Sequence, residues 1–181
     1  MSCTKPLGWY RAWAYNTLDQ VTSAEDAEGR TTQYTYDAHG NLTEVQNAAT
    51  DTSSITYESR GLPIEVVDFN HNATTNTYDA TTGDLLTTTN GAGDQVSYTY
   101  DGIGRIATMT NGRSFTYTYS YDKNDNLVQM AGPLGYQISY AYDKNNNRTS
   151  ATDPNGGVST FTYDASERLV AQRNQLQFPT T

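Results

Sequence analysis

The sequence predicts an all-β protein, a tandem array of about eight 21-residue two-stranded β-hairpin repeats that form one long curved antiparallel sheet. Three observations predict it: a tyrosine that recurs at nearly constant spacing, an alternation of large and small residues before it, and turn-forming residues at two fixed places in each repeat. Self-similarity at a fixed period is the signature of repeat architectures, in which each unit packs on its neighbours.

The recurring tyrosine is followed each time by an acidic or amide residue. The eight tyrosines are separated by seven intervals, each of 21 or 22 residues. The tyrosines are Tyr15, Tyr36, Tyr57, Tyr78, Tyr100, Tyr121, Tyr142 and Tyr163. Two residues before each tyrosine stands a large apolar or aromatic residue, with Asn76 as the departure, and the residue between is small or β-branched. A period of two places both large residues on one face of a β-strand.

Turn signals follow each strand. Four residues after the tyrosine, Gly, Asn or Asp is usual, because these residues tolerate the positive φ of tight turns; Glu167 is the poor fit. Gly83 comes five residues after Tyr78, so this turn is expected to contain one extra residue. Beyond this turn, an aliphatic residue recurs at the same position of most repeats. Pro63 and Arg148 are the exceptions at that position, and Ile64 is expected to substitute for Pro63. A second turn, such as Asn111-Gly112, comes about half a period later.

The repeats are expected to occupy residues 13–171, with residues 1–12 and the tail 172–181 outside the register. Natural repeat arrays normally cap their open sheet edges, and neither short segment has the size of a domain. We therefore expect the chain to be a piece of a longer array.

Composition excludes several classes of protein. Eleven Lys+Arg against 20 Asp+Glu give a net charge of −9, which argues against a nucleic-acid partner. The sequence shows no apolar run long enough to span a bilayer and no signal-peptide pattern. The single cysteine, Cys3, excludes an internal disulfide and a CxxC metal site.

The segment Tyr100-Asp101-Gly102-Ile103-Gly104-Arg105-Ile106 resembles the YDxxGRL core of the RHS repeat, also called the YD repeat, and the segments 36–42 and 163–169 match it nearly as well. The resemblance covers about residues 12–172. It implies a β-sheet that spirals into a hollow shell, as in bacterial polymorphic toxins, insecticidal toxin complexes, wall-associated proteins and animal teneurins. In the toxins, such a shell encloses a C-terminal toxic domain.

We expect the repeated residues to be structural anchors rather than a catalytic set. They are Tyr15, Tyr36, Asp37, Gly40, Tyr57, Gly61, Tyr78, Asp79, Gly83, Tyr100, Asp101, Gly104, Tyr121, Asp122, Tyr142, Asp143, Tyr163 and Asp164. The aspartates are expected to accept hydrogen bonds from turn amides, as in Asx turns.

The sequence predicts no enzymatic activity, no cofactor and no metal site. His39 and His71 fall in turns of different repeats, and no column of the repeat supplies a nucleophile beside them. The alternating oxygen ligands that begin at Asp122 and Asp143 resemble the start of a calcium loop, but the later Glu of an EF-hand is missing. Asp153-Pro154-Asn155-Gly156 is similar to the self-cleaving DPxG motif of the toxin family, but it falls at a half-period turn and is interpreted as a turn.

The predicted function is structural: wall material for a shell around a C-terminal toxin or other cargo, in a larger exported protein that is secreted or lies at the cell surface. Its partners would be other repeats of the same shell and the cargo. Exposed aromatic rings leave open a carbohydrate-binding module for wall or cell-surface glycans. Open sheet edges leave open a self-assembling fibre protein.

Replacing Tyr100 by alanine tests the structural role of the tyrosines. We expect the variant to lose about 3 kcal/mol of unfolding free energy, as for other packed aromatic side chains. The measurement is urea or thermal unfolding, and melting like the wild type would contradict a packed column of tyrosines.

Overall fold

The computed structural model describes residues 12–175, which form sixteen strands that follow one another in chain order in one sheet. The expected all-β, two-stranded repeat is confirmed, whereas the curvature of the sheet stays a prediction. The chain divides into two compact units, Met1–Gly93 and Asp94–Thr181, and each is considered by itself. No helix among residues 12–175 is long and apolar enough to cross a membrane.

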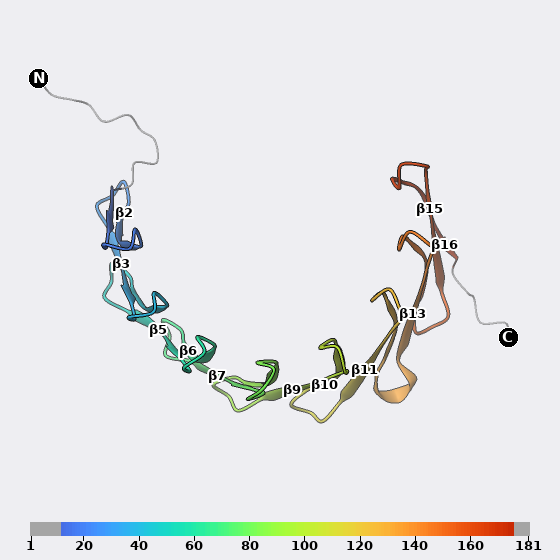
Figure 1. The fold of residues 1–181 in the computed structure, drawn as a ribbon, viewed down its shortest axis with the longest axis horizontal. Helices are drawn as coiled ribbons and strands as arrows, with labels where there is room; N and C mark the ends of the chain where they lie inside the picture. The colour runs from blue at the N-terminus through green and yellow to red at the C-terminus, as the bar shows by residue number, and fades with distance from the viewer. Residues whose placement is uncertain (1–11, 176–181) are drawn as a thin grey trace, which may run out of the picture. The chain divides into compact units, whose positions relative to one another are not determined.

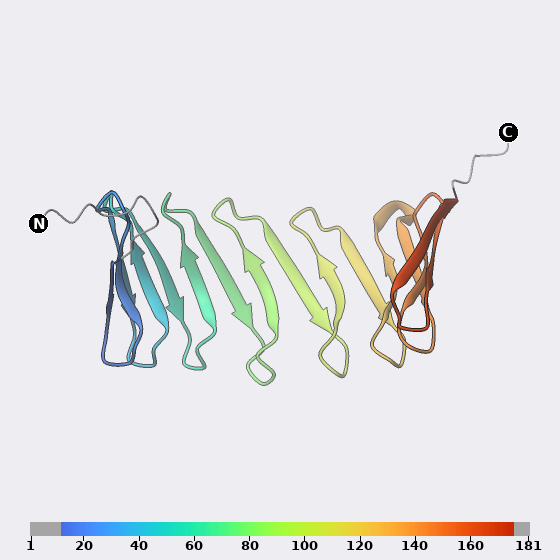
Figure 2. The ribbon, with the colours of Figure 1, turned by 90° about the horizontal axis from the view of Figure 1, so that it is seen from above.

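The first unit contains eight strands, and in Figure 2 they lie side by side with turns at two edges. The strands are β1 (Ala12–Tyr15), β2 (Val21–Glu25), β3 (Thr31–Tyr36), β4 (Leu42–Gln46), β5 (Thr52–Tyr57), β6 (Pro63–Val67), β7 (Ala73–Tyr78) and β8 (Leu85–Thr89).

The second unit, coloured green to red in Figure 1, repeats the same arrangement and adds one short 3₁₀ turn, η1 (Pro133–Gly135). Its strands are β9 (Gln95–Tyr100), β10 (Ile106–Thr110), β11 (Thr116–Tyr121), β12 (Leu127–Ala131), β13 (Gln137–Tyr142), β14 (Arg148–Thr152), β15 (Val158–Tyr163) and β16 (Leu169–Gln175). Residues 172–175 of the expected tail thus extend β16 and pair with β15. Cys3 and residues 176–181 lie outside the described residues.

Every odd-numbered strand ends at a repeat tyrosine, which lies opposite the first residue of the next strand. A β-bulge stands just before this pair: Thr35 faces Glu44 and Tyr36 faces Leu42, so Thr43 has no residue opposite it. Bulges sharpen the local twist and redirect a strand. The expected substitution of Ile64 for Pro63 is wrong, because Pro63 itself opens β6 opposite Tyr57. Proline is tolerated as the first residue of a strand.

Backbone pairing differs within and between repeats. Within a repeat, β3 and β4 pair from Gln33–Gln46 as far as Tyr36–Leu42, close to the turn that follows the tyrosine. Between repeats, the pairing of β2 with β3 covers only residues 23–25 and 31–33, next to the half-period turn. The other repeat junctions inside each unit have the same short pairing. Side chains must therefore connect the repeats near the tyrosine turns.

The two faces of the sheet differ in chemistry, since residues that face each other in the register share a face. In the second unit one face carries large apolar residues and the other polar ones. The apolar row includes Tyr98, Met109, Tyr117, Tyr119, Met130 and Ile138. The polar row includes Thr99, Thr108, Thr118, Ser120, Gln129 and Ser139.

Neither face forms an ordinary hydrophobic core. Among the described side chains, only Ala24 is buried, at 9% exposure, and the repeat tyrosines other than Tyr15 are half-buried. A single-layer sheet of this kind depends on contacts between adjacent strands and adjacent repeats, which add up along the array.

Candidate functional site: the YD-turn edge

The turn that follows each repeat tyrosine, here called the YD turn, is organised by the residue after the tyrosine. The repeats are numbered by their tyrosines, from Tyr15 in repeat 1 to Tyr163 in repeat 8. In repeat 6, Asp122 Oδ1 accepts hydrogen bonds from the backbone N–H of Asn124 at 2.8 Å and of Asn126 at 2.9 Å, and Oδ2 accepts from Asn126 Nδ2 at 3.0 Å. Equivalent backbone bonds to the acidic or amide side chain occur in other YD turns, those of Asn16, Asp37, Asp101, Asp143 and Asp164. This is Asx-turn chemistry, which satisfies turn amides that no strand can pair.

The fourth residue after the tyrosine takes a left-handed conformation. Glu167 has φ 61° and fits this position after all, like Asp125 at 66° and Gly104 at 86°. In the longer turn of repeat 4, Asp79 Oδ1 accepts from the N–H groups of Thr81 and Thr82, both at 2.8 Å, and Gly83 takes the left-handed conformation. The extra residue predicted here is therefore confirmed within the turn.

In six of the repeats the tyrosine hydroxyl connects the repeat to the one before it. Tyr121 Oη donates to the carbonyl oxygen of Ile106 at 3.0 Å, the first residue of the second strand in the preceding repeat. The same bond, 2.8–3.0 Å long, joins Tyr36 to Val21, Tyr57 to Leu42, Tyr78 to Pro63, Tyr142 to Leu127 and Tyr163 to Arg148. We call it the tyrosine–carbonyl bond. It lies where backbone pairing between repeats has already ended.

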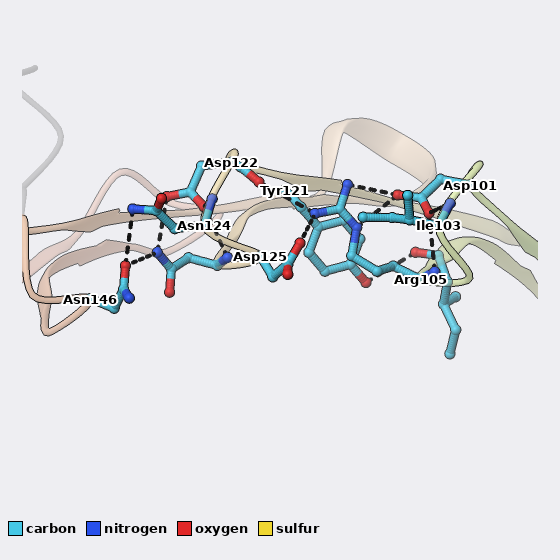
Figure 3. Close-up of polar contacts among 10 residues, drawn as sticks. Asp101, Ile103, Arg105, Tyr121, Asp122, Asn124, Asp125 and Asn146 are labelled. Atoms are coloured by element: carbon cyan, nitrogen blue, oxygen red, sulfur yellow. Dashed lines mark hydrogen bonds and ion pairs between the residues drawn. The ribbon is translucent and has the colours of Figure 1, made fainter.

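Side chains of one YD turn also reach the next. In Figure 3, Arg105 contacts the Asp101 carboxylate of its own turn at 2.7 Å and that of Asp125 in the following turn at 2.7 Å. Its guanidinium carbon lies 4.5 Å from the centroid of the Tyr121 ring, and Nη1 donates to the Asp122 carbonyl at 3.3 Å. Such a cation–π contact with charge-assisted hydrogen bonds suits a planar guanidinium.

Other side chains make similar turn-to-turn contacts elsewhere. Gln20 Nε2 donates to the carbonyl of Gly40 at 2.8 Å, and Arg60 Nη1 donates to the carbonyl of Asp79 at 3.0 Å. Asn124 and Asn126 both donate to Asn146 Oδ1, at 3.2 and 2.8 Å (Figure 3). The YD-turn edge is thus joined from repeat to repeat by hydrogen bonds that the backbone does not supply.

Comparison with known families agrees with this geometry. The Teneurin YD-shell family model matches residues 49–180, most of the chain, and the RHS Repeat model matches residues 4–52. The chain belongs to the teneurin YD-shell family. A comparison with curated proteins found no match.

Solved structures show the fold of this YD-shell chain in larger proteins. It is similar to the crystal structure of TcdB2-TccC3-Cdc42, with a TM-score of 0.76 and 18% identity over 90% of this chain. It is also similar to the Tc holotoxin pore of Photorhabdus luminescens, with a TM-score of 0.74 and 19% identity over 88% of this chain. The chain spans about 10% of the length of either matched chain.

The residues considered for chemistry do not come together in this YD-shell segment. His39 and His71 are both exposed, in the YD turn of repeat 2 and in a half-period turn. Within residues 12–175, no three His, Cys, Asp or Glu side chains are placed to hold a metal ion. Asp153 Oδ1 accepts from the N–H of Asn155 and of Gly157, so the Asp153-Pro154 sequence is an Asx turn as interpreted.

Sequence reasoning missed the tyrosine–carbonyl bond and the turn-to-turn contacts. The acceptor of the first is a backbone atom, for which no residue type is diagnostic. The sequence did contain a signal for the turn-to-turn contacts, at the fifth residue after the tyrosine. Gln20, Arg105 and Asn126 stand at this position, and each has a side chain with a terminal N–H donor that reaches the next turn.

Hydrogen bonding lowers the pKa of the YD-turn aspartates. The Asn126 side chain, followed by the backbone N–H groups of Asn126 and Asn124, holds the pKa of Asp122 below its ordinary value of 3.8, although burial opposes this. The side-chain amide and backbone N–H of Asn41 likewise lower the pKa of Asp37. Hydrogen bonds to the ionised form account for both shifts.

Removing one tyrosine hydroxyl tests the tyrosine–carbonyl bond. Tyr121→Phe keeps the ring beneath Arg105 and deletes the bond to Ile106, so we expect a loss of about 1 kcal/mol in the free energy of unfolding. The matched control is Tyr117→Phe, since the Tyr117 ring packs edge-on against Tyr136 and its hydroxyl makes no hydrogen bond to a described residue. The control should stay within about 0.5 kcal/mol of the wild type in denaturant unfolding; equal losses in both variants would contradict the role of the bond.

The YD-turn aspartates predict a loss of stability in acid. Their pKa values are lower in the folded than in the unfolded chain, so their contribution is complete above about pH 4 and is lost as pH falls through the folded-state pKa. Asp122→Asn should keep the turn, as Asn16 does in repeat 1, and show a smaller drop in melting temperature between pH 5 and about pH 2.5 than the wild type. Asp122→Ala should melt lower at every pH. A steeper acid dependence in Asp122→Asn than in the wild type would refute the assignment.

Proposed function

We propose that this chain is a segment of the wall of a β-shell, within a larger exported protein whose shell encloses a C-terminal toxin or other cargo. The observation that carries the proposal is a single-layer sheet in which successive repeats are connected at every described junction within a unit by short backbone pairing. Near the YD-turn edge this pairing gives way to tyrosine–carbonyl bonds. Such a sheet is suited to being a wall, because contacts between neighbouring repeats hold it together and it does not need a second layer of strands from the same segment.

The family and the similar structures support this function. The chain belongs to the teneurin YD-shell family, and its fold recurs in structures of TcdB2-TccC3 and of a Tc holotoxin pore. Those chains are about ten times longer than the match, so the enclosure of cargo and the export of the whole protein belong to the proposal.

The proposal assigns no catalysis to this segment. The carboxylates of the YD turns accept hydrogen bonds from turn amides and arginines, which accounts for them structurally. A general acid or base would need a substrate-sized site with a reacting group beside it. The proposed partners are further repeats of the same shell and the enclosed cargo.

The two alternatives from sequence stay predictions. The tyrosine–carbonyl bonds and the half-burial of the rings favour packing within the sheet over the stacking of sugars on exposed rings. The fibre alternative depends on the open sheet edges.

Protection of the cargo is the measurement that tests the proposal. It is made on the complete polypeptide as its source cell produces it, by limited proteolysis followed by mass spectrometry of the fragments. We expect the segment beyond the repeats to resist cleavage, and to become cleavable when Tyr121→Ala weakens the wall. Rapid cleavage of that segment in the folded wild type would overturn the enclosure role; Tyr117→Phe serves as the control that leaves the wall intact.

A further inference from the structure

One repeat junction in the first unit differs from the junction drawn in Figure 3. At the junction of repeats 5 and 6, the Arg105 guanidinium fills the space between the two YD turns, over the Tyr121 ring and against the Asp101 carboxylate. At the junction of repeats 2 and 3, the residue in the position of Arg105 is Asn41. Its Nδ2 reaches only the Asp37 carboxylate of its own turn, at 2.9 Å.

A hollow of about 360 Å³ lies at this junction. Its lining includes Asp37, Asn41, Tyr57, Glu58 and Gly61, which correspond by repeat position to Asp101, Arg105, Tyr121, Asp122 and Asp125. The junction therefore has the carboxylate, the aromatic ring and the turn of the following repeat that surround a guanidinium elsewhere in the same chain. Asn41 stands in place of Arg105 with its Nδ2 on Asp37, and Gly61 stands in place of Asp125 without a side chain, so no side chain of this chain takes the position of the guanidinium.

The charges of the hollow suit a cation. Asp37 and Glu58 contribute two carboxylates to the lining and Arg60 contributes one guanidinium, so negative charge is in excess. Arg60 pairs with Glu58 Oε1 at 2.7 Å, but its Nη1 is directed to the carbonyls of Asp79 and Ala80 in the next repeat. The Asp37 carboxylate is ionised at neutral pH, and the hydrogen bonds from the Asn41 side chain and backbone lower its pKa further. His39, also in the lining, is exposed at the rim.

We propose that the hollow between the YD turns of repeats 2 and 3 binds the arginine side chain of a partner polypeptide, whose guanidinium takes the place that Arg105 occupies between repeats 5 and 6. The guanidinium would lie over the Tyr57 ring and donate to the Asp37 carboxylate and to the turn of repeat 3. A planar guanidinium is favoured over an ammonium because it can stack on the ring and donate to two acceptors at once. The inference rests on the internal repeat and does not depend on the shell function.

The test is an NMR titration of the ¹⁵N-labelled chain with the peptide acetyl-Gly-Arg-Gly-amide. We expect saturable shifts of the Asn41, Glu58 and Gly61 backbone amides, with a Kd on the order of 1 mM. The same peptide with citrulline, which has nearly the same shape but no charge, should bind about tenfold more weakly, and the lysine peptide should also be weaker. Equal binding of the citrulline peptide would overturn the proposal.

Variants locate the site. Asn41→Arg should fill the hollow from within and abolish the shifts, whereas the charge-matched Ser166→Arg, in an exposed YD turn of the other unit, should leave the Kd within about twofold. Unchanged binding to Asn41→Arg would refute the site. If that variant does not fold, Asp37→Asn decides: it retains the acceptor atom that Asn16 uses in repeat 1, removes the charge, and should weaken binding about tenfold. Full affinity in Asp37→Asn would also refute the site.

Discussion

The hydrogen bond from a tyrosine hydroxyl to a carbonyl of the preceding repeat compensates for a weakness of this sheet. Backbone pairing between repeats stops after a few residues, so the strands would otherwise separate toward the YD turns. The bulge before Tyr36 places its ring at the end of the strand, from which the hydroxyl reaches Val21. One side chain thus combines apolar packing with a polar contact, for which tyrosine is suited. The constant spacing of the tyrosines follows from this geometry.

The remaining features of the YD-turn edge depend on the same spacing. Once the tyrosine holds two repeats together, consecutive turns lie close enough for Arg105 to reach Asp125, and for Asn126 to reach Asn146. Each contact is exposed or half-exposed and contributes little by itself. Stability in a repeat array is nevertheless a sum over neighbouring units, so a small contribution at each junction is sufficient.

The strands, the two turns of each repeat and the Asx role of the aspartates were predictable, because alternation and turn chemistry depend on local sequence. Pro63 and Glu167 were misjudged for a related reason: their neighbours hold them in the repeated conformation despite their own preferences. The tyrosine–carbonyl bond was not predictable, since its acceptor is backbone. The hollow beside Asn41 was equally hidden, because it becomes visible only when one junction is compared in space with another.

The YD turn of repeat 4 contains one more residue than the others, and yet β7 ends at Tyr78 and β8 begins opposite it in the usual register. Arg60 still reaches this turn through the carbonyls of Asp79 and Ala80. Changes of length are therefore absorbed locally instead of shifting the strands that follow. The array can acquire or lose residues at such turns without a change in the register of the strands that follow. This makes the tip near Thr81 a natural place to graft a foreign peptide.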